Sequence, residues 1–358
     1  MLGNTKVYKP QTPRPYQNQA IESVQGDWLS GSDAVLVAMA TGTGKTTVAS
    51  ELLKKEIKPD KKRTLVIAHT EEIVFQLYER ISNQFAGELN NNLYCGMKMY
   101  PGIGIVMAKN DVPEARIVVA TRQSLHPKRL KEVLQYGKFD VVMIDEAHHA
   151  VLDNSYGTII EAVRADNPAV KIVGFTATPK RTDRKALKTV WDKISYAYLI
   201  PDAIQDGWLT PATRIKVETQ VSLDNVKTRA GDYSQKQMMS ILKAANWLEL
   251  ATKAFMEYVV DSDRRCLAFM PSVQMSKDFT ASLKAQGVKI AHLDGKTPKD
   301  ERRKILSDYA IGKLQAISNC LVLTEGFDAP ATDAIFLARP TRSGTLFTQI
   351  LGRGLRPY

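Results

Sequence analysis

The chain has 358 residues, of which 44% are hydrophobic and 24% are charged, a composition that is ordinary for a globular protein. This length predicts two domains, each large enough for its own core. The sequence contains no run of about 18 apolar residues, which argues against a transmembrane helix. Its three cysteines lie far apart without CxxC spacing, which disfavours a disulfide framework or a zinc site.

The net charge of +11 suits a polyanionic partner such as nucleic acid, although a merely basic surface is an alternative. The first residues lack the apolar core of a signal peptide. We therefore expect a cytoplasmic protein with no membrane attachment, whose cysteines are reduced and buried.

A helix is predicted to begin near Tyr16, because Tyr16, Ala20, Ile21 and Val24 recur at helical spacing. Gln17 on this helix is either an exposed polar residue or an adenine-reading amide, which offers a donor and an acceptor together. Buried strands then alternate with helices, which indicates a mostly parallel sheet covered on both faces. The expected strands are residues 34–39, 63–69, 103–108, 116–120, 139–146 and 171–179, and residues 171–179 are expected to be the last strand of this set. Helices are expected at residues 47–54 and 71–85. Residues 54–63 are expected to form a solvated basic loop.

A short helix and turn over residues 202–211 is a plausible hinge, and a second alternating set follows it. Its expected strands are 214–221, 265–270, 289–293, 316–323 and 334–338, with a helix at 299–309. The fold class is therefore α/β, with two similar domains at residues 1–205 and 206–358.

A glycine-rich turn follows the first apolar strand and opens a helix. Gly42 and Gly44 let the backbone bend so that its N–H groups point inward, and together with the helix N-terminus they form an anion cradle. Lys45 would reach the outer phosphates of a nucleotide, and the Thr46 hydroxyl would bind Mg²⁺. Met39 departs from the strict P-loop pattern, which has glycine there. The predicted nucleotide-binding residues of this turn are Thr41, Gly42, Thr43, Gly44, Lys45, Thr46 and Thr47.

Two acids follow the strand at residues 141–144. Asp145 can hold Mg²⁺ opposite Thr46, and Glu146 can orient and deprotonate the water that attacks a γ-phosphate. Acids also occur commonly at helix starts, which is the plainer alternative. His148 and His149 have no third ligand at a sensible spacing, so metal binding by them is disfavoured.

Two hydroxyl residues, Thr176 and Thr178, follow the next strand and form either a hydrogen-bond relay or a simple turn. In the second half, Arg353 and Arg356 lie three residues apart, so they are expected to point the same way from one helical turn. Arginines placed in this way can stabilise the charge of a phosphoryl transition state. The neighbouring Gly352 and Gly354 indicate a close approach to something.

These motifs, taken in order, resemble those of superfamily 2 helicases of the DEAD/DEAH-box type. The similarity is greatest to the DNA-directed branch that includes RadD-like helicases and restriction-enzyme motor subunits. The matches are Gln17 to the Q motif, 40–46 to motif I, 69–73 to motif Ia, 121–124 to motif Ib, 145–148 to motif II in its DEAH form, 176–178 to motif III, 269–272 to motif IV, 324–328 to motif V and 349–356 to motif VI.

The resemblance implies two tandem RecA-like domains with ATP in the cleft between them. It implies catalytic roles for Lys45, Asp145, Glu146, Arg353 and Arg356, and nucleotide contacts from Gln17, Gly326 and Asp328 besides the glycine-rich turn. It further implies coupling of hydrolysis to domain motion by His148, Thr176, Thr178 and Gln349, and nucleic-acid contacts from Thr70, Arg122, Ser272 and Thr324.

The expected function is therefore that of an Mg²⁺- and ATP-dependent DNA helicase or translocase. Where strands separate, members of this branch usually have 3′ to 5′ polarity, but the sequence itself does not indicate the polarity. DNA is favoured over RNA, and the protein is expected to be a monomer with a possible protein partner. An RNA helicase, a remodelling ATPase or clamp that does not separate strands, and an inactive nucleotide-dependent binding module are alternatives. The chain stops two residues after Arg356, whereas family members usually complete the second sheet beyond motif VI. Either this is a minimal form or, as we favour, the sequence is a fragment whose second domain lacks its last elements.

Overall fold

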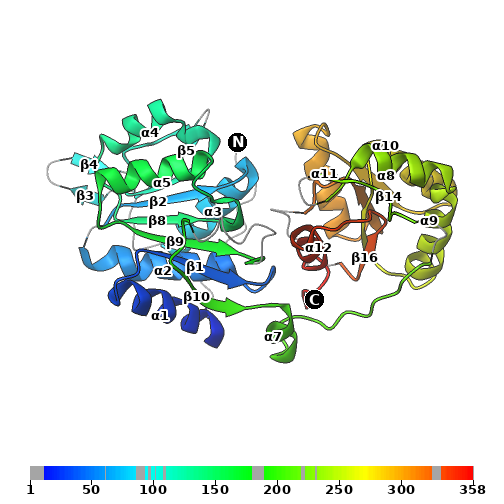
Figure 1. Ribbon diagram of the computed structural model, residues 1–358, viewed down its shortest axis with the longest axis horizontal. Helices are drawn as coiled ribbons and strands as arrows, with labels where there is room; N and C mark the ends of the chain where they lie inside the picture. The colour runs from blue at the N-terminus through cyan, green and yellow to red at the C-terminus, as the bar shows by residue number, and fades with distance from the viewer. Residues whose placement is uncertain are drawn as a thin grey trace. The chain divides into compact units, whose positions relative to one another are not determined.

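The computed structural model describes residues 12–60, 62–85, 93–95, 98–100, 102–107, 110–179, 189–218, 222–229, 232–324 and 332–357. Cα proximity divides the chain into two compact units, Met1–Ala203 and Ile204–Tyr358. Each unit is an α/β structure built on its own sheet, as predicted (Figure 1).

Unit 1 contains an eight-stranded sheet in the order β10-β1-β9-β8-β2-β7-β5-β6. All neighbouring strands are parallel except β5 and β6, which are antiparallel. Strands β1, β2, β7 and β8 are buried along their whole length, as expected for a sheet covered on both faces. The strands are β1 (Ala34–Met39), β2 (Thr64–Ala68), β5 (Ile103–Met107), β6 (Asn110–Asp111), β7 (Ile117–Thr121), β8 (Val141–Ile144), β9 (Lys171–Thr176) and β10 (Lys193–Tyr198).

Helices pack on both faces of this sheet (Figure 1). Helix α1 begins at Pro15, and the apolar residues predicted from its spacing, Tyr16, Ala20, Ile21 and Val24, are buried. The other elements are α2 (Lys45–Asp60), α3 (Glu71–Gln84), α4 (Pro127–Leu134), α5 (Ser155–Asp166), the 3₁₀ turns η1 (Gln123–Leu125) and η2 (Ala147–His149), and a hairpin of β3 (Leu93–Cys95) and β4 (Lys98–Tyr100); α1 itself spans Pro15–Leu29.

Two predictions for unit 1 were wrong. Strand β9 is not the last of its set, because β10 pairs in parallel with β1 at the edge of the sheet. The stretch from Lys54 to Asp60 is not a loop but the C-terminal part of α2. In an amphipathic helix the charged face points to water, so a basic run is compatible with a helix as well as with a loop.

Unit 2 contains four parallel strands in the order β14-β15-β13-β16. One apolar cluster includes Phe255, Phe279 and Phe336, whose rings pack 5.3 to 5.8 Å apart. The elements are β13 (Cys266–Phe269), β14 (Ile290–Leu293), β15 (Ala316–Asn319), β16 (Ala334–Leu337), α7 (Ile200–Gln205, at the boundary of the units), α8 (Gln235–Ala244), α9 (Trp247–Phe255), a π-helical turn η3 (Met256–Val260), α10 (Val273–Ala285), α11 (Lys299–Ala310), α12 (Gly344–Leu351) and a hairpin of β11 (Thr228–Arg229) and β12 (Asp232–Tyr233).

The strand expected at residues 214–221 is not present in the described part of that stretch. Residues 214–218 are exposed and have no regular structure, whereas residues 219–221 lie outside the described residues. Ile215 and Val217 alternate with polar residues, but nothing in the described structure pairs with this segment to make it a strand. Among the described helices, none is long and apolar enough to cross a membrane.

Candidate functional site

Five neighbouring strands of unit 1 end at the same edge of the sheet. They are β1, β9, β8, β2 and β7, and each is parallel to its neighbour. The carboxyl edge of a parallel sheet is where ligands bind in such folds. The polar motifs predicted for unit 1 directly follow these five strands, so the sheet brings them to one edge.

The glycine-rich turn after β1 has a backbone conformation that depends on its glycines. Gly42 and Gly44 have φ of 90° and 84°, a left-handed conformation that favours glycine. The turn is closed by hydrogen bonds from the Thr43 N–H and hydroxyl to the Ala40 carbonyl, at 3.3 and 2.7 Å. Helix α2 begins at Lys45, and the Lys45 ammonium donates to the Met39 carbonyl at 3.3 Å.

Gln17 supports this turn from the side. Its Nε2 donates to the Thr43 carbonyl at 2.9 Å and its Oε1 accepts from the Arg14 N–H at 2.8 Å, while the side chain is buried. A Cβ on Gly44 would lie 2.4 Å from Gln17 Nε2, so the two residues fit only with glycine at this position. The Tyr16 hydroxyl donates to the same Thr43 carbonyl at 2.9 Å, a contact that no sequence pattern predicted.

The two acids after β8 occupy different environments. Asp145 is partly exposed, and its N–H donates to the Ile67 carbonyl of β2 at 2.9 Å. Glu146 is buried and has a left-handed backbone with φ of 47°, which turns the chain into η2. A non-glycine residue in this conformation is uncommon and is concentrated at functional sites.

His148 connects this turn to the end of β9. Its Nδ1 lies 3.2 Å from the Thr176 hydroxyl and 3.3 Å from Glu146 Oε2, and the ring is buried. The Thr176 hydroxyl also accepts from the Thr178 N–H at 3.1 Å. The structure thus places Glu146, His148, Thr176 and Thr178 together, and these residues of motifs II and III form one contact network.

Thr70 and Arg122 lie at the ends of β2 and β7. The Thr70 hydroxyl accepts from the Ile73 N–H at 3.3 Å and caps α3. The Arg122 N–H donates to the Ala68 carbonyl at 3.2 Å, and its guanidinium donates to the Ser155 hydroxyl at 2.9 Å. These two predicted nucleic-acid contacts therefore lie at the same edge as the glycine-rich turn.

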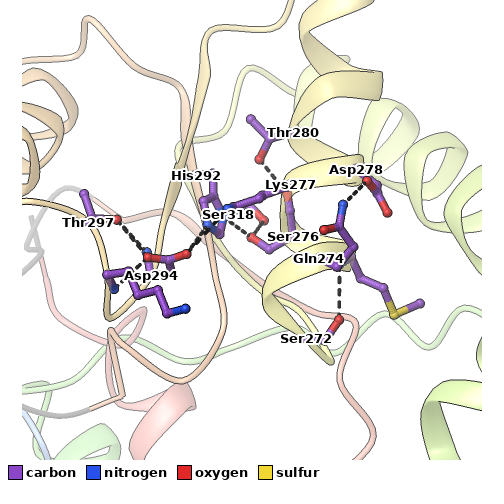
Figure 2. A network of polar contacts seen from close by, with 12 residues as sticks. Ser272, Gln274, Ser276, Lys277, Asp278, Thr280, His292, Asp294, Thr297 and Ser318 are labelled. Atoms are coloured by element: carbon purple, nitrogen blue, oxygen red, sulfur yellow. Dashed lines mark hydrogen bonds and ion pairs between the residues drawn. The ribbon is translucent and has the colours of Figure 1, made fainter.

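Unit 2 repeats this arrangement in part. The Ser272 hydroxyl caps α10 by accepting from the Met275 N–H at 3.2 Å, as Thr70 caps α3. Behind it, the Ser276 hydroxyl lies 2.7 Å from both His292 Nδ1 and the Ser318 hydroxyl, which joins α10, β14 and β15 (Figure 2).

Asp294 completes the network drawn in Figure 2. It accepts from His292 Nε2 at 3.1 Å, from the Lys296 N–H at 2.8 Å and from the Thr297 hydroxyl at 3.3 Å. The hydrogen bond from His292, followed by the other two donors, lowers the pKa of Asp294 to about 2. Asp294 therefore fixes the turn between β14 and α11 as a carboxylate.

The two arginines of motif VI do not share a helical turn, contrary to the prediction. Helix α12 ends at Leu351, with Gly352 as its C-cap, and residues 352–354 form a turn. Gly354 does allow a close approach, because a Cβ there would lie 2.8 Å from Ile335 Cγ1 of β16. The helix thus ends before both arginines, so they do not lie on one helical turn.

Arg353 and Arg356 have different surroundings. Arg353 is buried and donates to the Thr324 carbonyl at 2.6 Å, which joins motif VI to motif V. Arg356 is partly exposed, and Gln349 is buried. The predicted nucleotide contacts Gly326 and Asp328 lie outside the described residues. Of the cysteines, Cys266 is a buried free thiol and Cys320 is partly exposed, whereas the side chain of Cys95 lies outside the described set.

Comparison with protein families agrees with this arrangement of motifs. Residues 11–181 match the family "Type III restriction enzyme, res subunit", and residues 250–357 match "Helicase conserved C-terminal domain". The chain belongs to the superfamily 2 helicases. Each unit therefore carries one of the two RecA-like domains of a helicase core, as the resemblance predicted.

Individual relatives agree with this assignment. This helicase is 28% identical over 366 residues to "Putative ATP-dependent helicase IRC3" of Saccharomyces cerevisiae, a match that covers 98% of this chain and 50% of that protein. It is 29% identical over 358 residues to an irc3 helicase of Schizosaccharomyces pombe whose name describes it as "putative mitochondrial", with 96% and 55% covered. The chain thus spans about half the length of the curated relatives it matches.

A solved structure shows the same fold. "The fragment structure of a putative HsdR subunit of a type I restriction enzyme from Vibrio vulnificus YJ016" superposes with a TM-score of 0.70 at 24% identity, covering 97% of this chain and 62% of that one.

The helicase motifs do not account for the Ser276–His292–Asp294 network or for Tyr16. The sequence contained no usable signal for the network, because its three members come from different elements at separations of 16 and 2 residues. The sequence pattern placed Tyr16 on the apolar face of α1, and its ring is buried there. What the pattern did not predict is the hydrogen bond from the Tyr16 hydroxyl to the Thr43 carbonyl.

Proposed function

We propose that this helicase core is an Mg²⁺-dependent ATPase that translocates along or unwinds DNA. The observation that carries the proposal is the arrangement at the carboxyl edge of the unit 1 sheet. There the glycine-rich turn after β1 and the acids after β8 are separated only by β9, whose end supplies Thr176. Anion-binding N–H groups and metal-binding oxygens are thus provided by one rigid scaffold.

The residues present fit Mg-ATP. Gly42 and Gly44 hold the left-handed backbone of the turn, and a Cβ on Gly44 would collide with Gln17. Helix α2 begins at Lys45, so its N-terminus adds a favourable dipole for phosphate. Thr46 and Asp145 provide hydroxyl and carboxylate oxygens, the ligands that Mg²⁺ prefers alongside phosphate oxygens and water. Gln17 retains a second N–H and a second lone pair with which to contact adenine.

The chain's own residues then have separate tasks. Lys45 exchanges its contact with the Met39 carbonyl for the outer phosphates, and Glu146 accepts the proton of the water that attacks the γ-phosphate, giving ADP and inorganic phosphate. His148 holds Glu146 and Thr176 in register. When bound, Mg²⁺ neutralises charge on the phosphate oxygens.

Arg356, together with Arg353, is proposed to act on the nucleotide that unit 1 binds. Gln349 is proposed to help couple turnover to domain motion. Gly326 and Asp328 are proposed to contact the nucleotide, with Asp328 near the ribose. These roles are taken from the family motifs, in which arginine stabilises transition-state charge.

DNA is the proposed track for two reasons. The chain has a net charge of +11, and its first half matches a family of restriction-enzyme subunits. Thr70 and Ser272 support the proposal, because each caps a helix with its oxygen and keeps an O–H that can donate to a phosphate. Arg122 and Thr324 are proposed as further contacts. An RNA track remains the second candidate, and ATP-driven remodelling without strand separation the third.

The first experiment is steady-state ATPase activity, measured alone and with single-stranded DNA, duplex DNA and RNA at one salt concentration. Lys45→Ala and Glu146→Gln are each expected to lower turnover by at least 100-fold. Lys55→Ala is the matched control, because Lys55 lies exposed in the same helix, α2. Near-normal turnover in either active-site variant would contradict the assignment.

The results of that experiment also distinguish between the alternative nucleic-acid tracks. Stimulation by DNA alone supports the DNA track, and stimulation by RNA alone supports the RNA helicase. Strand displacement on duplexes with a 3′ or a 5′ overhang then tests unwinding and the proposed 3′ to 5′ polarity. Sedimentation of the protein with and without DNA tests the proposed monomeric state.

A further inference from the structure

His149 connects three of the motif segments of unit 1, although no motif assigns it a role. Its ring stacks on the ring of His69 with centroids 4.6 Å apart and planes 17° apart. Its ring centre also lies 4.1 Å from that of His148, with the two planes tilted by 40°. The three imidazoles therefore form a contiguous cluster that joins the end of β2 to the turn after β8.

The backbone of His149 adds a second connection. Its carbonyl accepts from Asn154 Nδ2 at 2.8 Å, and Asn154 caps α5 through the Tyr156 N–H. The next residue, Ser155, accepts the hydrogen bond from Arg122. The start of α5 therefore links His149 to the strand end that carries Arg122.

These contacts lead from two proposed nucleic-acid residues to the proposed general base. His69 directly precedes Thr70, so a movement of Thr70 displaces the ring that stacks on His149. His149 also donates its N–H to the Glu146 carbonyl at 3.0 Å, within the turn whose left-handed residue is Glu146. A shift of His149 therefore changes the conformation of the residue that must orient the attacking water.

We propose that His69 and His149 are positioning residues that couple nucleic-acid binding to ATP hydrolysis within unit 1, through the stack of their rings. This inference rests on the proposed function, because it requires a nucleic acid that contacts Thr70 and Arg122. The stack transmits position and not charge: two flat rings in van der Waals contact move together, whereas aliphatic or absent side chains leave the two strand ends free to move independently.

The test compares His149→Ala, which removes the ring, with His149→Phe, which keeps a flat ring. His149→Ala keeps the backbone N–H that donates to the Glu146 carbonyl and removes only the ring contacts. We therefore expect basal ATPase activity within about twofold of wild type and stimulation by DNA reduced at least tenfold. The ratio of DNA affinities with and without a non-hydrolysable ATP analogue should fall toward 1 from a value in the usual range of about 5 to 150. His149→Phe should restore most of both quantities. His126→Ala, at the exposed N-cap of α4, is the control.

Several results would overturn the proposal. They are unchanged stimulation in His149→Ala, an equal loss of basal and stimulated activity, or a His149→Phe variant as defective as the alanine variant. If His149→Ala does not fold, as judged by circular dichroism, His69→Ala and His69→Phe carry the same comparison. Failure of the proposed function is distinguishable, because the wild-type protein would then show no stimulation by any nucleic acid.

Discussion

Arg63 lies at the amino end of β2, at the edge of the sheet opposite to the glycine-rich turn. Its guanidinium is buried and donates to the carbonyl oxygens of Pro113, Ala115, Val133 and Gly137, and it lies 4.3 Å from the centre of the Phe139 ring. One side chain thus satisfies backbone groups from the segments that precede β7 and β8.

Replacing Arg63 by methionine keeps an unbranched aliphatic stem but removes the guanidinium, which leaves these carbonyls without their donor. We expect Arg63→Met to lower the free energy of unfolding of unit 1 by about 3 to 5 kcal/mol. Urea denaturation measures this change, with Arg264→Met as the control at an exposed arginine. A loss below 1 kcal/mol would show that water replaces the guanidinium, and nucleotide affinity of the folded variant should be unchanged.

Asp294 makes the stability of unit 2 dependent on pH. Its pKa is lowered to about 2, chiefly by the hydrogen bond from His292, and Lys277 lies 4.0 Å from its carboxylate. A lowered folded-state pKa means that the stabilisation is complete above the unfolded value of about 4 and is lost as the pH falls through about 2.

The comparison with Asp294→Asn isolates this contribution. We expect the wild type to be more stable than the variant by about 1 to 3 kcal/mol above pH 5, with a difference that shrinks steadily between pH 4 and pH 2. Urea unfolding at a series of pH values measures the difference. A gap that is constant across this range would mean that the carboxylate charge is not what stabilises the turn.

Two helices of unit 1 carry an internal glycine, and the same substitution should have opposite effects in them. Gly26 of α1 is exposed, and a Cβ there would meet nothing within 4 Å. Gly157 of α5 is buried, and a Cβ there would lie 2.0 Å from the Leu152 carbonyl oxygen. The first glycine only weakens its helix, whereas the second allows the preceding loop to pack on α5.

We expect Gly26→Ala to stabilise unit 1 by about 0.5 to 1 kcal/mol, because alanine has the higher helix propensity. Gly157→Ala should destabilise it by about 1 to 3 kcal/mol, because the backbone of the loop must move. Thermal and urea unfolding of the two variants provide the comparison. Equal effects in both helices would show that helix propensity, and not packing, determines how the substitution at residue 157 changes the free energy of unfolding.

At this scale, sequence patterns predicted the elements that are buried on all sides. Strands β1, β2, β7 and β8 are continuous apolar runs and were placed to within a few residues. The edge strand β10 was missed, because its sequence, Lys193–Tyr198, mixes polar and apolar residues in a half-exposed position. Whether a segment of this kind forms a strand depends on the presence of a neighbouring strand to pair with. β10 pairs with β1, whereas residues 214–218, which have a similar alternation, have no partner in the described sheets.

The candidate site was predictable where one local segment contains it and not where distant segments meet. The glycine-rich turn and Asp145-Glu146 are contiguous motifs, so their types and spacing were sufficient. The cluster of His69, His149 and His148 brings together His69 and His149, which are 80 residues apart in sequence number, and a single sequence contains no signal for such packing.

At the scale of the whole molecule, the two units supply different parts of the proposed ATPase. The glycine-rich turn, Asp145 and Glu146 all belong to unit 1, whereas Arg356 belongs to unit 2. Binding and turnover should therefore be separable by mutation. Arg356 is the better test residue than Arg353, because Arg353 is buried against the Thr324 carbonyl and its loss would also disturb unit 2.

We expect Arg356→Ala to bind a fluorescent ATP analogue within about threefold of the wild-type affinity, because the phosphate cradle is intact. Its DNA-stimulated turnover should fall by about 10³-fold or more, the usual effect of removing an arginine that stabilises transition-state charge. Arg264→Ala, also in unit 2 and exposed, is the control for the loss of one positive charge. If Arg356→Ala lost analogue binding and turnover in parallel, the arginine would act in binding the ground state, and the proposed division of labour between the units would be wrong.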